Sequence, residues 1–334
     1  MRDSFPNESP TLKRVFRKLA GSFWVRVVVS AGLLALIATH IDFSNALHSL
    51  VDGEWGWFAL AVLALVLASA LASYRWHLYL QACDVDRSWR RALSAYFLGV
   101  FTSNFLPSQV GGDVLRALMV GRQGARVRSF ATVVIDRASA LACLIAVAWA
   151  FVAAEPGAVP RSLVLTLAVV SALFAAFVAA VLGAGKAGSR LLRFLPGRLR
   201  PAADEALTAV RASLRGAVLA KTLLLGVVFQ TLGVVAACSI GRSIGLSVAT
   251  PALVTSLPLV VVLSFLPFSI GGLGIREGGF VVLLGQAGVS ATDATVFSLL
   301  NGLAFALASL PGVIAFVRAG RSTAKEPPPA PLRE

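Results

Sequence analysis

FLPSQVGGDVLR (residues 105–116) and FLPFSIGGLGIR (residues 265–276) are matching stretches from the two halves of the chain. They align without a gap at a constant offset of 160 residues, from 105 to 265, and share the pattern FLPxxxGGxxxR. A proline and a glycine pair at matched places in two apolar segments are typical of paired broken membrane helices, which mark the binding site in many transporters. The pattern predicts an internal repeat with its working site where the two stretches meet.

The composition of the whole chain indicates a membrane protein. Of its 334 residues 57% are hydrophobic and 14% are charged, and the mean hydropathy is +0.81. A soluble protein carries about 25% charged residues. Several apolar runs reach the ~20 residues that a helix needs to cross a bilayer. We therefore expect an all-α polytopic membrane protein, with about six transmembrane helices plus two re-entrant broken-helix segments in an inverted repeat.

The net charge of +14 is best explained by the membrane. Basic residues hold loops on the cytoplasmic side and contact anionic lipid headgroups, so nucleic acid is not expected as a partner. The cysteines Cys83, Cys143 and Cys238 show no CxxC or other metal spacing, and the three histidines form no metal motif. No metal or other cofactor is expected.

The chain divides into a basic cytoplasmic tail (1–22), a single transmembrane domain (23–318) and a disordered cytoplasmic tail (319–334). A cytoplasmic basic loop at 183–216 contains an amphipathic helix over about 202–215, expected on the inner membrane surface. The crossings are expected at about 23–41, 57–73, 129–154, 162–182, 217–240 and 294–317.

The two repeated stretches lie in segments that we expect to be re-entrant. Basic loops flank residues 92–120 on both sides, so this segment enters the membrane, breaks at Pro107–Gly112 and returns to the same side. The second segment covers about 251–288. Three crossings separate the two segments, so the second enters from the outer side. The two halves would then be inverted copies, as in many secondary transporters.

The distribution of lysine and arginine sets the orientation. Every Lys and Arg except Arg137, Arg161, Arg242 and Arg276 falls in a region that this threading makes cytoplasmic. By the positive-inside rule, both termini are then expected to be cytoplasmic. The segment 74–77 (YRWH) is expected to be an aromatic and basic border at the interface.

Arg116 and Arg276 occupy matched positions in the repeat. A charge at membrane depth costs roughly 2.5–3.5 kcal/mol on insertion scales, so it usually has a partner or a function. The planar guanidinium suits phosphate, and a Gly-Gly turn could offer backbone N–H groups beside it. The alternative is that Arg116 is a cytoplasmic anchor and that Arg276 pairs with Glu277. The glycines concerned are Gly111, Gly112, Gly271 and Gly272.

Four further charged residues complete the candidate substrate-binding set. Asp113 and Glu277 flank the two arginines at unmatched positions, where they either neutralise their neighbours or take part in proton coupling. Asp136 and Arg137 lie about two turns into the third crossing. Consecutive helical residues do not face each other, so each needs a partner elsewhere. They either form structural ion pairs or line the path of the lipid.

These residues carry a resemblance to a known family. Three motifs carry the resemblance: Pro107-x-x-x-Gly111-Gly112-Asp113-x-x-Arg116, Asp136-Arg137 and Ser269-Ile270-Gly271-Gly272-Leu273-Gly274-Ile275-Arg276-Glu277-Gly278. Through them the sequence resembles the transmembrane part of lysylphosphatidylglycerol synthase/flippase proteins, also described as flippase-like or UPF0104-type membrane proteins. The resemblance covers about residues 20–318. In name-giving members this module is implicated in moving an aminoacylated phospholipid between leaflets, whereas aminoacyl transfer belongs to an appended soluble domain. Stand-alone relatives look linked to other lipids, including hopanoid or polyprenyl-phosphate pathways.

Three functions are compatible with the sequence. The first is a translocase that moves an anionic or amphipathic lipid, with its headgroup held by Arg116 and Arg276. The second is a membrane-embedded transferase acting on a lipid phosphate, with Asp113 or Glu277 as general base. The third is an accessory subunit that binds a lipid-biosynthetic enzyme through the basic surface around 186–215. The sequence contains no HExxH, GxSxG or P-loop signature that would indicate an enzyme. The expected partners are membrane lipids, of phospholipid or polyprenyl-phosphate type.

Overall fold

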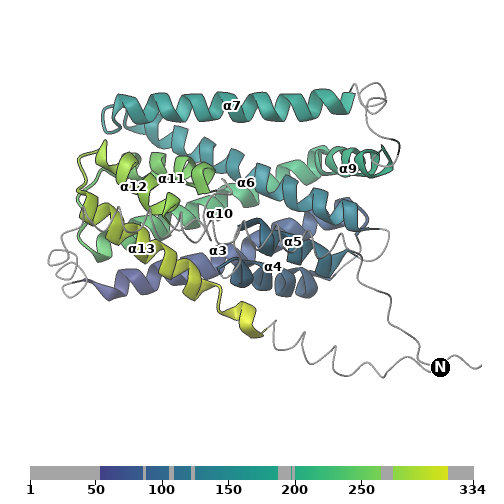
Figure 1. The fold of residues 1–334 in the computed structure, drawn as a ribbon, viewed down its shortest axis with the longest axis horizontal. Helices are drawn as coiled ribbons and strands as arrows, with labels where there is room; N and C mark the ends of the chain where they lie inside the picture. The colour runs from purple at the N-terminus through teal and green to yellow at the C-terminus, as the bar shows by residue number, and fades with distance from the viewer. Residues whose placement is uncertain are drawn as a thin grey trace, which may run out of the picture.

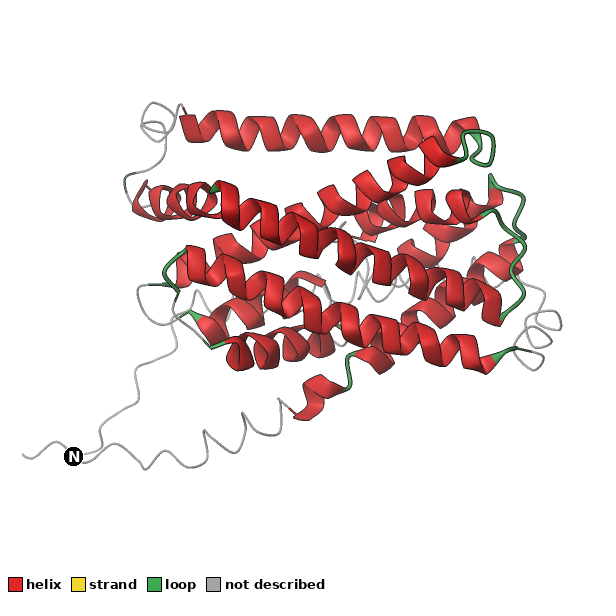
Figure 2. Cartoon of the chain, turned by 180° about the vertical axis from the view of Figure 1, so that it is seen from behind, coloured by secondary structure: helices red, strands yellow, loops and turns green. Residues whose placement is uncertain are grey.

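The computed structural model of the chain describes residues 53–85, 88–104, 109–121, 125–186, 197, 200–264 and 274–314. Within these residues all regular secondary structure is helical (Figure 2). The helices are α3 (Trp55–Ala82), α4 (Trp89–Ser103), α5 (Gln109–Val120), α6 (Arg126–Ala154), α7 (Arg161–Lys186), α9 (Arg200–Ser213), α10 (Gly216–Ser243), α11 (Thr250–Ser264), α12 (Ile275–Gly285) and α13 (Ala291–Ala308). The expected first crossing, the second FLPxxxGG stretch up to residue 273 and both tails lie outside the described residues.

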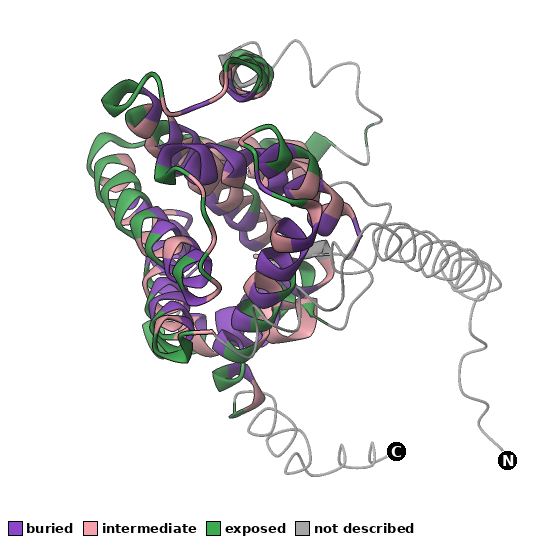
Figure 3. Cartoon of the chain, turned by 90° about the vertical axis from the view of Figure 1, so that its left-hand side faces the viewer, coloured by how far each residue is buried: buried purple, intermediate pink, exposed green. Residues whose placement is uncertain are grey.

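Five described helices are long and apolar enough to cross a membrane: α3, α6, α7, α10 and the helix that begins with α13. α3 and α10 have 28 residues each, about 42 Å at 1.5 Å per residue. Their outward surfaces are apolar, as a lipid-facing surface requires, and Figure 3 shows buried residues gathered toward the inside of the bundle. The chain is therefore a multi-pass membrane protein, as the composition predicts.

α3 and α10 pack side by side and run antiparallel. The N–H of Glu54, just before α3, donates to the carbonyl of Ser243 at the end of α10 (2.9 Å). Both helices end in the same way: a residue with positive φ follows the last turn, Asp84 (53°) after α3 and Gly245 (62°) after α10. Such left-handed residues close helix C-termini by turning the chain so that the last carbonyls find N–H partners. The matched helices and matched ends extend the repeat beyond the two quoted stretches.

α4 and α5 form the first re-entrant hairpin. With 15 and 12 residues, they reach about 22 and 18 Å, too short to cross a hydrocarbon core of about 30 Å. α4 follows α3 closely, and α5 leads directly into α6. The Arg128 guanidinium of α6 donates to the carbonyl of Cys83 at the end of α3 (3.1 Å). The hairpin therefore starts and finishes at one end of the bundle. We call this the basic end, since exposed Arg90, Arg126 and Arg215 lie there.

α11 and α12 form the second hairpin, of 15 and 11 residues. It follows the C-terminus of α10, and because α10 is antiparallel to α3, the second hairpin begins at the opposite end of the bundle. Figure 1 shows α4 and α5 toward one end and α11 and α12 toward the other. The two halves, α3–α6 and α10–α13, are inverted copies of one arrangement.

Two cores hold the bundle together, one for each hairpin. The first, at the basic end, joins α3, α4, α5, α6 and α9 around Trp76, Leu80 and Tyr96. The second joins the remaining parts of α3 and α6 to α7, α10, α11, α12 and α13 around Phe280 and Phe297. The amide of Asn104, at the tip of the first hairpin, donates to the Ser309 hydroxyl at the end of α13 (2.9 Å), so the tip is held by the other half.

Two expectations for the first half need correction. The second crossing does not end near residue 73, because α3 continues to Ala82 and buries Arg75, Trp76 and His77 of the segment expected at the interface. The break of the first hairpin does not include Gly111 and Gly112. Helix α5 begins at Gln109, so both glycines lie inside its first turn.

Candidate functional site

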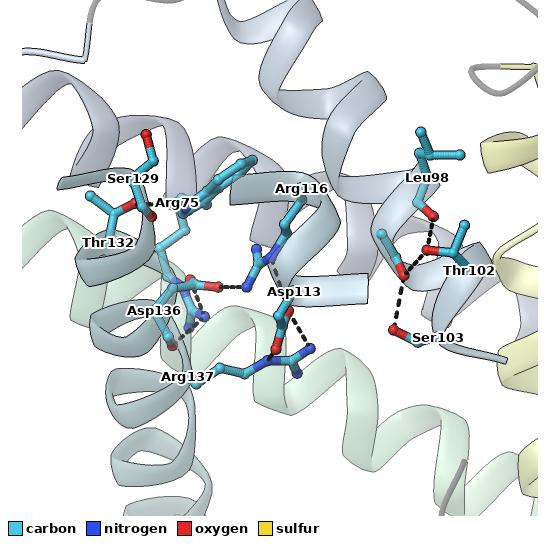
Figure 4. Close-up of polar contacts among 12 residues, drawn as sticks. Arg75, Leu98, Thr102, Ser103, Asp113, Arg116, Ser129, Thr132, Asp136 and Arg137 are labelled. Atoms are coloured by element: carbon cyan, nitrogen blue, oxygen red, sulfur yellow. Dashed lines mark hydrogen bonds and ion pairs between the residues drawn. The ribbon is translucent and has the colours of Figure 1, made fainter. Parts of the chain in front are cut away.

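Five charged side chains from α3, α5 and α6 form one connected cluster (Figure 4). Asp136 of α6 stands between two arginines. One carboxylate oxygen accepts from Nη2 (2.7 Å) and Nε (3.0 Å) of Arg75, and the other accepts from Nη2 of Arg116 (3.2 Å). All three side chains are at most 2% exposed. Buried ions of this kind are tolerated because each has a hydrogen-bonded partner of opposite charge.

Asp113 of α5 extends the cluster toward the surface. Its Oδ1 accepts from Nε of Arg116 (3.0 Å) and Nη2 of Arg137 (3.0 Å), and its Oδ2 accepts from Nε of Arg137 (2.8 Å). Arg137 is 36% exposed, the most accessible of the five. Arg116 thus links the two carboxylates, and Arg137 is the outer member of the chain of ion pairs. We call these five residues (Arg75, Asp113, Arg116, Asp136 and Arg137) the charge cluster.

Aromatic rings fix the inner arginines. The Arg116 guanidinium lies between Trp76 of α3 and Tyr96 of α4, with its carbon 4.8 Å from each ring centroid. Arg75 lies over Phe229 of α10 at 5.3 Å. A guanidinium over an aromatic face gains up to about 2 kcal/mol when it is desolvated. The rings thus pack against Arg116 and Arg75, the two buried arginines of the cluster.

The charge cluster is not neutral. It holds three arginines and two aspartates, so it carries one positive charge in excess. Nη1 of Arg75 and Nη1 of Arg116 are buried without a hydrogen-bond partner among the described residues. Buried N–H groups are normally paired, and each unpaired one costs roughly 1–3 kcal/mol. Both the unbalanced charge and the unpaired groups favour an added anion or hydrogen-bond acceptor.

The charge cluster lies well inside the membrane-spanning helices α3 and α6 rather than at their ends. Asp136 is ten residues from the start of α6, and Arg75 seven residues from the end of α3, or about 15 and 10 Å by helical rise. The cluster therefore lies nearer the basic end than the opposite end of these helices. Charges at this depth are rare in membrane proteins and usually serve a function.

The second half holds one ion pair at the matched arginine. Nη2 and Nε of Arg276 donate to Oε1 of Glu277 (2.6 and 3.0 Å). The other Glu277 oxygen accepts from the N–H of Gly274 (2.6 Å), and the Ser298 hydroxyl approaches Oε1 at 3.4 Å. Glu277 is fully buried in the first turn of α12, where its carboxylate accepts from the N-cap residue in a capping box. This pair is neutral and contacts the start of α12. The pairing of Arg276 with Glu277 is the structural alternative expected from the sequence.

The predicted site residues are therefore divided between two places. Asp113, Arg116, Asp136 and Arg137 come together, while Arg276 and Glu277 form a separate pair in the other half. Asp136 and Arg137 do face different neighbours. Arg116 is not a surface anchor, because it is 2% exposed. Gly271 and Gly272 lie outside the described residues.

Gly112 has a packing role in the structure. A Cβ atom on it would overlap the carbonyl of Gly99 and the hydroxyl of Ser103, both on α4. A Cβ on Gly99 would in turn lie 2.8 Å from the carbonyl of Gly112. The two glycines thus let the backbones of α4 and α5 touch, as small residues do between membrane helices. This contact carries Asp113 and Arg116 close to α3 and α6.

Arg75 is the member of the charge cluster that the sequence reasoning missed. Aromatic residues beside it, Tyr74 and Trp76, suggested an interfacial border. The signal that could have revealed it is the absence of a helix-ending residue before Cys83-Asp84, which allows α3 to continue. Arg75 then lies seven residues, about two turns, before the end of α3. Trp76 and Tyr96 were likewise not recognised as partners of Arg116.

The chemistry open to the charge cluster is electrostatic binding. The described residues contain no group of three or more His, Cys, Asp or Glu that could hold a metal ion. Every carboxylate oxygen of Asp113 and Asp136 already accepts a hydrogen bond from a guanidinium. By contrast, Nη1 of Arg137 has no partner among the described residues and lies on a partly exposed side chain.

Comparison with known proteins supports a membrane role. The family model described as lysylphosphatidylglycerol synthase TM region matches residues 23–312. One curated relative, the UPF0104 membrane protein PH1989 of Pyrococcus horikoshii, is 19% identical over 118 residues. That alignment covers 34% of this chain and 35% of the relative, so the chain spans about a third of the relative that it matches.

Proposed function

The chain belongs to the family of lysylphosphatidylglycerol synthase transmembrane regions, and on that premise we propose that it is a lipid translocase of the bacterial inner membrane. The lipid headgroup would pass through the protein while the acyl chains stay in the bilayer. The cargo would be an anionic or amphipathic lipid. The synthase activity in the family's description is not part of this proposal.

The observation that carries the proposal is the charge cluster. Its five charges lie at membrane depth, on a hairpin that does not cross the membrane and on the two helices beside it. The five side chains carry one extra positive charge, and the Nη1 side of the Arg137 guanidinium at the edge of the cluster has no partner among the described residues. A phosphate oxygen is a strong partner for that guanidinium, which can bind it through two parallel hydrogen bonds.

The inverted halves support translocation rather than simple binding. Two hairpins that enter from opposite ends give each leaflet its own broken helix, the arrangement by which many transporters alternate access. We assign the basic end to the cytoplasm, since exposed arginines gather on the cytoplasmic side of membrane proteins. Both termini would then be cytoplasmic, and the charge cluster would meet lipid from the inner leaflet.

The transferase alternative loses support in the structure. Its candidate general bases are Asp113 and Glu277. Asp113 accepts hydrogen bonds from Arg116 and Arg137, and Glu277 accepts from Arg276 and the N–H of Gly274. Both oxygens of each carboxylate are thus occupied by hydrogen-bond donors of the protein itself, which leaves neither arranged to contact a substrate hydroxyl. The accessory-subunit alternative remains as an outcome of the experiment below.

A transport assay tests the proposal. The purified protein is reconstituted into vesicles that contain fluorescent phosphatidylglycerol, and an impermeant reductant quenches the label in the outer leaflet. Translocation predicts loss of the protected fluorescence in protein-containing vesicles and not in empty ones. Arg137→Gln should slow the loss, whereas Lys221→Gln, an exposed charge on α10 outside the charge cluster, should not. Equal behaviour of empty and protein-containing vesicles would refute the translocase and favour an accessory role.

A further inference from the structure

The charge cluster also indicates which lipids the protein accepts. We propose that it selects headgroups with one net negative charge on a phosphodiester and discriminates against zwitterionic and cationic headgroups. This inference rests on the proposed function, because it assigns a charge class to the cargo of the same site. It concerns the headgroup alone.

The first argument is charge balance. Three guanidinium groups and two carboxylates leave one positive charge without a counter-ion among the described residues. Arg128, about two turns before Asp136 on α6, is not a further unpaired charge, because it forms an ion pair with Glu205 (3.1 Å). A phosphodiester monoanion would neutralise the charge cluster, and a headgroup with an added ammonium would not. An unbalanced charge is most costly at membrane depth, where water does not screen it.

The second argument is the geometry of Arg137. Its Nε and Nη2 bind Asp113, so one edge of the guanidinium is occupied and the Nη1 side is open. The side chain is 36% exposed, whereas Arg116 and Arg75 are at most 2% exposed. An anion therefore meets Arg137 first. The buried arginines, Arg75 and Arg116, do not contact the anion directly. They lie behind Asp113 and Asp136 and add fixed positive charge to the site.

The third argument is the lack of a place for an ammonium group. A headgroup amine would need a carboxylate, and the four carboxylate oxygens of Asp113 and Asp136 each accept from at least one guanidinium. Displacing a bond from Arg75 or Arg116 would leave a buried guanidinium without its carboxylate partner. Aromatic faces could bind a cation, but Trp76 and Tyr96 already hold Arg116. The charge cluster is thus built for an anion and is closed to a cation.

The test measures which lipids the full-length protein retains. The protein is purified after equilibration with equimolar phosphatidylglycerol and phosphatidylethanolamine, and bound lipids are quantified by mass spectrometry. The wild-type protein should enrich phosphatidylglycerol about tenfold, the factor expected from one charge-assisted contact. Arg137→Gln makes the charge cluster neutral and should abolish the enrichment, while Lys221→Gln should retain it. Equal retention of both lipids by the wild-type protein would overturn the inference.

A second variant tests the charge balance in the other direction. Asp113→Asn raises the excess to two positive charges, so preference should shift toward phosphatidate, whose phosphomonoester carries about −1.5 to −2 charges. An unchanged preference in a variant that elutes as the wild type does would contradict the charge-balance argument. Competition with glycerophosphoglycerol, the deacylated phosphodiester, shows whether the free headgroup suffices. Displacement of bound phosphatidylglycerol by millimolar glycerophosphoglycerol would overturn the assignment to a lipid.

The transport assay keeps the two proposals apart. Transport of phosphatidylglycerol and phosphatidylethanolamine at equal rates would refute the charge selectivity and leave the translocase standing. Enrichment of phosphatidylglycerol without any transport would do the reverse.

Discussion

The two inverted halves share a backbone plan and differ in where they place charge. In α3–α6, five charged side chains meet at membrane depth with one positive charge in excess. In α10–α13, the matched Arg276 has a single partner, Glu277, and the positions that correspond to Asp136 and Arg137 at the offset of 160 are Val296 and Phe297. The repeat supplies the hairpins, and only one half supplies a charged site. Symmetry of fold therefore does not require symmetry of function.

The largest effect should come from Asp136→Asn. This change removes the carboxylate shared by Arg75 and Arg116 and leaves two buried guanidinium groups without it. Loss of one partner from a buried ion pair typically costs about 3–5 kcal/mol. Thermal unfolding of the detergent-solubilised protein measures the loss.

The matched change in the other half is Glu277→Gln. A glutamine oxygen still accepts from the N–H of Gly274, and Arg276 is 18% exposed, so part of its charge is solvated. The loss should be smaller than for Asp136→Asn. Equal losses would contradict the view that the first half holds the denser charge network.

Gly112→Ala should have the next largest effect. The added methyl group would overlap the backbone of α4 at Gly99, which has no flexible end to move aside. Overpacking of this kind costs about 1–3 kcal/mol. Gly279→Ala is the control between α12 and α11. Its methyl would meet the side chains of Leu263 and Val260 at 3.3 and 3.5 Å, and these can adjust. Unfolding midpoints should fall clearly for the first variant and little for the second; the reverse order would refute the packing account.

A smaller effect is expected from Gly302→Ala. The Arg276 guanidinium lies against Gly302, so a methyl group there would displace the end of a flexible side chain and weaken its pair with Glu277. The loss should be about 1 kcal/mol or less. A double-mutant cycle with Glu277→Gln measures the coupling. Additive losses would show that Gly302 does not act through this ion pair.

Much of the fold could be predicted from the sequence, because membrane helices follow from apolar length alone. The five described crossings, the first hairpin and its inverted counterpart all agree with the apolar runs and with the repeat of FLPxxxGG. The range of α9, Arg200–Ser213, nearly coincides with the amphipathic helix predicted over about 202–215. These features depend on local composition, which the sequence carries directly.

The site could be predicted only in part. The repeat identified Arg116, and the charge in the third crossing identified Asp136 and Arg137, since charges stand out in apolar segments. Which charge pairs with which depends on how α3, α5 and α6 pack, and no local pattern encodes that. Arg75 was missed because its aromatic neighbours are typical of a membrane border. The packing role of Gly112 depends on Gly99, thirteen residues earlier, and the motif alone does not reveal this.

The central claim is that the charge cluster of the first half, and not the ion pair of the second, holds the headgroup during translocation. The most direct test is the rate of phosphatidylglycerol transport in vesicles with Arg137→Gln and Arg276→Gln, measured side by side. Loss of a charge-assisted contact should slow transport about tenfold or more for Arg137→Gln. Arg276→Gln should change the rate by less than about threefold, because Arg276 pairs with Glu277 and does not bind the headgroup in this account. Equal loss in both variants, or loss in Arg276→Gln alone, would contradict the account.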